Sequence, residues 1–228
     1  MGIVVMDALS HQAIRALGTE GLHYGAPPDR TGQWRGNRLT GLENSLVAMG
    51  HSLRFAAPAS AELASADVLI IASRSQDLPL SADELAAIRD FVLADGGLLL
   101  MANHRHFIRP QQQVAAALQL PFGFKDLTII DFPEIEVVPH PLTTGCGQLL
   151  VRNSTALAVA AEAEVVARFV GDRTQVFAAA ASVGGGRVLA TGDSGFIASL
   201  DDAGKNMFES ASNARFVANA IDWLSGAR

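Results

Sequence analysis

Short apolar runs alternate with helical repeats over the first half of the chain. Four apolar runs are each predicted to form a strand, at residues 3–6, 52–55, 67–72 and 98–102. The third, DVLIIA, is apolar on both faces, which is typical of a parallel strand covered on both sides. Apolar residues at helical spacing predict helices at residues 39–49, 85–92 and around 114–118. This βαβα alternation predicts a parallel α/β sheet.

The helix that follows the third run has clear end signals. Ser81 and Glu84 form a capping-box pattern at its start. Its buried stripe is predicted to consist of Leu85, Ile88, Phe91 and Val92. Gly96 and Gly97 are predicted to end this helix, as Gly50 is predicted to end the helix at 39–49.

The second half of the chain predicts hairpins. Residues 164–170 and 175–182 flank the turn signal GDRT, and GGG at 184–186 leads into a strand at 187–191. A last helix carries a stripe made of Phe216, Val217, Ala220, Ile221 and Leu224. The predicted fold is a flavodoxin-like, mostly parallel sheet flanked by helices, with an antiparallel hairpin region added in the C-terminal half. A single α/β domain is expected over residues 1–228.

Composition narrows the class of protein. Apolar residues make up 49% and charged residues 18% of the 228, which predicts a packed core. The formal net charge of −6 argues against nucleic-acid or anionic-membrane partners. The single Cys146 excludes an intramolecular disulfide and a multi-cysteine metal site. With no signal-peptide pattern and no apolar stretch long enough to span a bilayer, a cytoplasmic protein is expected.

Candidate chemistry gathers where the predicted parallel strands end, which is where ligands bind in open parallel sheets. The residues expected to contact a ligand are Asp7, His11, Asn103, His104, His106, Asp193 and Ser194. If the site is catalytic, His104 or His11 would act as general acid and base, oriented by Asp7 or Asp193. The alternative is structural, because loops after strands are polar in any case and Asp or Ser before a helix is a common N-cap.

Other kinds of site have less support. The side chains that could bind a metal through nitrogen or oxygen are Asp7, His11, His104, His106, His140 and Asp193, but they show no metal-binding spacing, so no metal site is predicted. Cys146 lies in the loop HPLTTGCGQ and does not follow a parallel strand, so a nucleophile elbow is not indicated. The GGGR sequence at 184–187 lacks P-loop and dinucleotide-binding spacing. The sequence indicates no particular cofactor.

Several segments, in order along the chain, resemble class I glutamine amidotransferase-like domains. These segments are VVMDALSH, the stretch from DVLIIASRSQDLPL to GGLLLMANH, HPLTTGCGQL, GGGRVLATGDSGFI and NARFVANAIDWL. The similarity is to non-amidotransferase branches, namely the trehalose-utilisation type and the uncharacterised domains that end in a Gly-Asp-Ser motif. True amidotransferases carry a Cys in an elbow after the fourth strand, where this chain has Asn103 and His104.

The resemblance therefore implies a fold without the glutaminase mechanism. It favours a protein that binds a polar small molecule, with carbohydrate as one class, or a protein partner. The alternative is a hydrolase or isomerase acting on a polar or sugar substrate with a His general acid/base, with or without a metal. A third alternative is an interaction domain whose surface is its function, which predicts a homo-oligomer.

Overall fold

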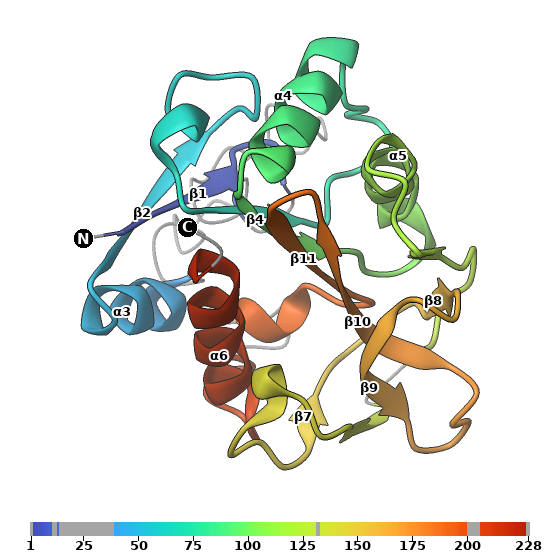
Figure 1. The fold of residues 1–228 in the computed structure, drawn as a ribbon. Coiled ribbons are helices and arrows are strands. Elements are labelled where there is room, and N and C mark those ends of the chain that lie inside the picture. Colours follow the sequence, from blue (N-terminus) through green and yellow to red (C-terminus); the bar gives the residue numbers. More distant parts are fainter. Residues whose placement is uncertain (1, 11–12, 14–38, 131–132, 200–205, 227–228) are drawn as a thin grey trace, which may run out of the picture.

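The computed structural model describes residues 2–10, 13, 39–130, 133–199 and 206–226 (Figure 1). The strands are β1 (Gly2–Asp7), β2 (His51–Ala56), β3 (Val68–Ala72), β4 (Gly97–Met101), β5 (Phe122–Phe124), β6 (Glu134–Val137), β7 (Leu149–Leu150), β8 (Leu157–Val159), β9 (Glu164–Phe169), β10 (Val176–Val183) and β11 (Gly186–Thr191). The α-helices are α3 (Thr40–Ala48), α4 (Ala82–Leu93), α5 (Arg109–Ala117) and α6 (Asn213–Ser225). Short 3₁₀ turns are η1 (Leu63–Ser65), η2 (Arg105–Phe107), η3 (Pro141–Thr143) and η4 (Gly195–Ile197).

The parallel half of the sheet has the order β2-β1-β3-β4-β11. All four neighbouring pairs in this order are parallel. This is the strand order of a flavodoxin-like sheet, with β11 in the fifth place. The four strands predicted from apolar runs are confirmed as β1 to β4, and the predicted fold class is confirmed with them.

The antiparallel half continues from β11 through β10, β9, β6 and β7. The predicted hairpins are confirmed, because β10 pairs antiparallel with both β9 and β11. Four short strands were not predicted from the sequence: β5, β6, β7 and β8. They span only two to four residues each, which is too short for a period of two to stand out.

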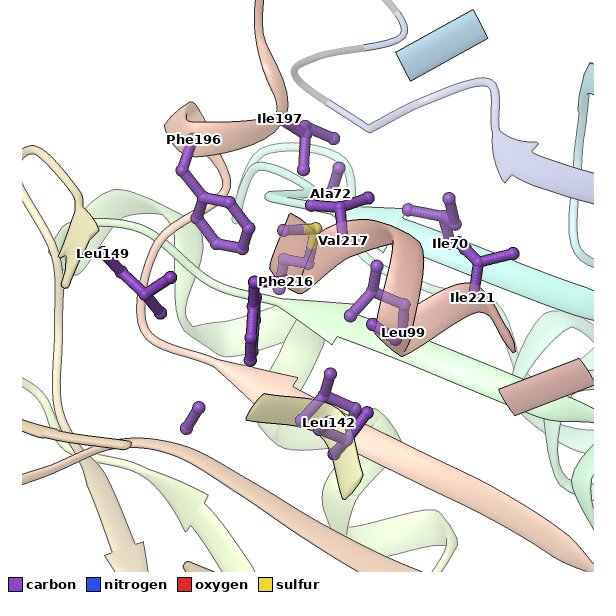
Figure 2. Close-up of a cluster of buried hydrophobic side chains, with 14 of the residues drawn as sticks. Ile70, Ala72, Leu99, Leu142, Leu149, Phe196, Ile197, Phe216, Val217 and Ile221 are labelled. Atoms are coloured by element: carbon purple, nitrogen blue, oxygen red, sulfur yellow. The ribbon is translucent and has the colours of Figure 1, made fainter. Parts of the chain in front are cut away.

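Helices cover both faces of the sheet. Figure 1 shows α3 and α6 on one face and α4 and α5 on the other. Side chains alternate between the faces, so Ile70 and Leu99 pack in the cluster under α3 and α6, whereas the adjacent Ile71 and Leu100 pack under α4 and α5. In the first cluster, Figure 2 shows Phe196 beside Phe216, and their ring centroids are 6.0 Å apart.

The prediction that Gly96 and Gly97 end α4 is not what the structure shows. The helix ends at Leu93, and Asp95 takes the left-handed conformation with φ of 72°. Gly97 is instead the first residue of β4. A Cβ at Gly97 would lie 2.6 Å from the carbonyl oxygen of Leu224, so glycine is needed there because α6 packs closely on the strand.

The start of α4 and most of its stripe agree with the sequence. The Ser81 hydroxyl accepts from the Glu84 amide, and the Glu84 carboxylate accepts from the Ser81 amide, which confirms the capping box. Ile88, Phe91 and Val92 are buried, whereas Leu85 is only partly buried against the core. The helices predicted at 39–49 and around 114–118, and the stripe of α6, are also confirmed.

Candidate functional site

The carboxyl ends of β1, β3, β4 and β11 lie side by side along one edge of the sheet, because these strands are parallel neighbours. Asp7 is the last residue of β1, residues 73–75 follow β3, residues 103–106 follow β4 and residues 193–194 follow β11. The predicted site residues that are described therefore lie along one edge. His11 lies outside the described residues.

These residues divide into two groups by exposure. Three are fully buried, namely Asp7, Asp193 and Ser194. Three are partly exposed, namely Asn103, His104 and His106. A ligand arriving from solvent can reach only the second group without a rearrangement of the chain.

Asp7 belongs to a buried ionic network centred on Arg74. The Arg74 guanidinium Nη1 lies 3.4 Å from Asp7 Oδ1 and 2.8 Å from Glu84 Oε1. The Ser10 hydroxyl donates to Asp7 Oδ2 at 3.1 Å and accepts from the Ala72 amide. Burial raises the pKa of the Asp7 carboxyl, and the positive charge of Arg74 opposes that shift.

Arg74 itself is 2% exposed, and nearby acceptors surround its guanidinium. Its Nε donates to the carbonyl of Leu78 at 2.7 Å and its Nη2 to the carbonyl of Pro79 at 3.2 Å. For Glu84, burial favours the neutral acid, but hydrogen bonds from Arg74 and Ser81 outweigh it and leave the pKa of Glu84 lowered. The network therefore joins the end of β1, the loop after β3 and the start of α4.

Arg74 was not among the residues predicted to form the site, although it lies two residues after the fully apolar strand β3. Asp7 ends the neighbouring strand β1. An arginine and an aspartate at adjacent strand ends are a sequence signal that could have identified the Arg74–Asp7 ion pair.

The backbone of Arg74 is also held in place by hydrogen bonds. With the Gln111 amide oriented to satisfy both neighbours, its oxygen accepts from the Arg74 amide and its nitrogen donates to the carbonyl of Phe107.

Ser194 hydrogen-bonds to the loop after β3. Its hydroxyl lies 2.5 Å from that of Ser73, and the Ser73 hydroxyl also donates to the carbonyl of Ala102 at 2.7 Å. Ser73 has a φ of 62°, which is the left-handed region that a residue with a Cβ rarely adopts. Strand ends from β3, β4 and β11 are thus joined through two buried hydroxyls.

Asp193 stabilises the turn that follows β11. Its Oδ1 accepts from the Gly195 amide at 2.7 Å and its Oδ2 from the Arg152 amide at 3.0 Å. Complete burial raises the pKa of the Asp193 carboxyl from 3.8 to about 6, although these amide hydrogen bonds favour the charged form. Both carboxylate oxygens are already engaged by backbone, so Asp193 acts here as a structural group.

His104 and His106 lie next to the same aromatic ring. Both imidazoles meet Phe107 edge to face, with centroid distances of 4.9 and 5.1 Å. The chain leaves β4 after Met101 and enters η2 at Arg105, and this turn places both imidazoles against Phe107. Partial burial and, to a lesser degree, the neighbouring His106 lower the pKa of His104.

His106 also contacts Ser75 and Asp77. Its Nε2 lies 2.9 Å from the Ser75 hydroxyl and 3.2 Å from Asp77 Oδ2. In a Ser-His-Asp triad the serine and the acid contact opposite ring nitrogens, whereas here both face the same nitrogen. Ser75 is also only 1% exposed. The cluster connects the loops after β3 and β4 and does not have the geometry of a hydrolytic triad.

The two remaining candidates for chemistry lie away from this edge. Cys146 is in the loop after η3, where Asn219 Nδ2 lies 3.8 Å from its sulfur, and partial burial raises the pKa of its thiol. His140 pairs with Glu164, at 2.9 Å from Nε2 to the carboxylate. Among the described residues, no group of three or more His, Cys, Asp or Glu side chains is arranged to hold a metal ion.

Comparison of the sequence with protein-family models and with curated proteins finds no match. Solved structures do match. The mmIFT52 N-terminal domain superposes with a TM-score of 0.68 at 10% identity, covering 97% of both chains. A Bacteroides uniformis protein described as ThuA-like gives 0.59 at 11% identity, covering 98% of this chain and 90% of the other. A Thermoplasma acidophilum protein described as a GMP synthase subunit gives 0.58 at 10% identity, covering 99% and 95%.

These similarities establish the fold: an α/β sheet with parallel strands flanked by helices, shared with ThuA-like and amidotransferase-like structures. The identities are too low to carry more than the fold. Within the described part of the chain, no helix has the length and apolar character needed to cross a membrane.

Proposed function

We propose that this chain is a member of the class I glutamine amidotransferase-like superfamily that lacks the nucleophilic cysteine and binds a polar small molecule at the carboxyl edge of its sheet. Membership of this superfamily is supported by the fold, which is shared with the ThuA-like protein and with the Thermoplasma protein described as a GMP synthase subunit. The sequence motifs at the strand ends point the same way.

One observation carries the proposal. The place after β4 where the amidotransferase nucleophile would stand holds Asn103 and His104, while the only thiol, Cys146, lies in a different loop with a raised pKa. A thiolate nucleophile is therefore missing from the edge where the chemistry would occur. What remains there is a set of hydrogen-bonding groups suited to recognition.

The open part of the edge is the segment after β4. Asp7, Asp193 and Ser194 are buried and hydrogen-bonded within the protein. Asn103 and His104 are partly exposed and offer an amide and an imidazole. We expect these two side chains to contact the ligand, and we expect the buried carboxylates to hold the loops that present them.

A thermal-shift screen with sugars, sugar acids and amino-acid amides tests this proposal, because a ligand that binds only the folded state raises Tm. The expected result is stabilisation of the wild type that is reduced in Asn103→Ala and His104→Ala. The control is His51→Ala, at the opposite end of the parallel strands, where β2 begins. Ammonia release from glutamine should be absent. Stabilisation that is unchanged in both edge variants would overturn the placement of the site.

A second candidate function is general-base catalysis by His104. It is favoured by the lowered pKa of a partly exposed imidazole, which keeps the ring neutral and able to accept a proton at pH 7. Turnover of a compound from the same panel that is lost in His104→Ala and kept in His51→Ala would establish an enzyme and replace the binding proposal.

A further inference from the structure

A groove of about 570 Å³ lies beside the start of α5, at the outer side of the same sheet edge. Its polar lining consists of Gln76, Arg105, Arg109, Gln112, Gln113 and Asp126. Gln76 belongs to the loop after β3 and Arg105 to the loop after β4, so the groove adjoins the region of Asn103 and His104. A volume of this size can hold a small metabolite.

The groove already holds one carboxylate in a guanidinium fork. Arg105 Nε donates to Asp126 Oδ1 at 3.0 Å, and Nη2 donates to Oδ2 at 3.4 Å. Both side chains are largely exposed, at 75% and 68%, so solvent screens this pair. Arg105 therefore faces a carboxylate of the chain itself, and Asp126 offsets its positive charge within the groove.

Arg109 is the second arginine that lines the groove. Among the described residues, no ion-pair or side-chain hydrogen-bond partner of Arg109 is found, and its side chain is exposed. It is the first residue of α5, a helix without a side-chain cap or an acidic residue in its first turn. A positive charge at a helix N-terminus is unfavourable with the helix dipole, and a bound anion would relieve that repulsion.

The remaining lining supplies hydrogen bonds and an apolar floor. The Oε1 of Gln112 accepts from the Phe124 amide at 2.8 Å, which fixes the carboxamide and leaves its NH₂ as a donor. The Oε1 of Gln113 is buried without a partner among the described residues. Ile108 and Phe124, which also line the groove, present apolar surface beneath these groups.

We infer that this groove binds a small molecule bearing a carboxylate or phosphate group, with the anion on Arg109 and the Gln112 amide and the apolar part over Ile108 and Phe124. This inference rests on the proposed binding function and names its ligand class. Nucleic acid is not the expected source of the anion, because the chain carries a net charge of −6 and the groove offers one unpaired arginine.

The test is an NMR titration of the wild type with two separate probes, inorganic phosphate and succinate, at ionic strength held constant with sodium chloride. Saturable shifts of backbone amides at the start of α5 are expected for at least one probe, and the two arms identify which anion is preferred. Arg109→Gln should weaken that binding about tenfold or more, because it removes a charged hydrogen-bond donor. Arg109→Lys should restore part of it.

Arg89→Gln is the matched control, because it removes the same charge from α4 outside the groove, where Arg89 pairs with Asp90. Its affinity should equal that of the wild type. The inference is overturned if neither anion gives saturable shifts, or if Arg109→Gln and Arg89→Gln bind equally well. The proposed function would survive either of these results if neutral sugars or amides stabilise the protein through Asn103 and His104.

Discussion

Ser73 and Ser194 share a hydrogen bond between their hydroxyl groups although they are 121 positions apart in the chain. Ser73 follows β3, Ser194 follows β11, and β4 lies between these two strands in the sheet. The same Ser73 hydroxyl donates to the carbonyl of Ala102, which follows β4. Three neighbouring strand ends are therefore fixed relative to one another directly beneath the proposed binding edge.

Ser73→Ala should lower the free energy of unfolding by about 1–2 kcal/mol, because it leaves buried partners unsatisfied. Ser73→Gly loses the same hydroxyl but relieves the left-handed backbone, at φ of 62°, and should be about 1 kcal/mol more stable than the alanine variant. Urea unfolding of both variants measures the difference.

The same experiments test the serine pair itself. The Ser73→Ala/Ser194→Ala double variant should be less destabilised than the sum of the single variants, because the hydrogen bond between the two hydroxyls can be lost only once. Strict additivity, or an alanine variant more stable than the glycine variant, would contradict this account of the contact.

Arg74→Met should be among the most destabilising single substitutions in the chain. It removes the cation between Asp7 and Glu84 and leaves buried carboxylates unpaired, for which a loss of about 3–5 kcal/mol is expected. Arg89→Met is the control, because its pair with Asp90 is exposed and should contribute well under about 1 kcal/mol. Both are measured by urea unfolding. Equal losses would mean that the buried network does not stabilise the fold.

The elements that the sequence predicted are those with local signals. The run VLIIA in β3 and the capping residues Ser81 and Glu84 act within a few positions of each other, so their outcome depends little on the rest of the chain. The strand β7 has only two residues, and its existence depends on pairing with β6. No periodic pattern can reveal a strand that long-range pairing defines.

The edge of the sheet was predictable, but the state of its side chains was not. Apolar runs and the rule for parallel strands placed Asp7 and Asp193 correctly at strand ends. Whether those carboxylates face solvent depends on Arg74, 67 positions from Asp7, and on the Arg152 amide, 41 positions from Asp193. Such partners come from tertiary packing, so the sequence alone could not separate buried structural acids from accessible ones.

His104 should titrate below the ordinary value of 6.5, because its partial burial disfavours the imidazolium form. His106 contributes a smaller effect of the same sign, so His106→Gln should raise the pKa of His104 without restoring the ordinary value. The Cε1 proton of His104, followed by NMR from pH 4.5 to 8.5, gives both midpoints. A His104 midpoint at or above 6.5 in the wild type would contradict the prediction.

Asp193 should make the protein less stable as pH rises from about 4 to about 6. Burial raises its folded-state pKa from 3.8 to about 6, so between these values the folded protein keeps a proton that the unfolded chain has released. The free energy of unfolding therefore falls through this window and is flat with respect to this group above it. Over the whole window, the free energy of unfolding should fall by an amount on the order of 3 kcal/mol.

The variant Asp193→Asn isolates this effect from other groups, such as Asp7, that titrate in both proteins. Asparagine retains one oxygen for the Gly195 amide but sets its NH₂ against the Arg152 amide, so the variant should be less stable at pH 4. Because only the wild type loses stability by ionising this residue, the difference between the two proteins should shrink as pH rises to 7. Urea unfolding at four pH values measures it. A difference that stays constant or grows would show that the Asp193 carboxylate is already charged in the folded protein at pH 4.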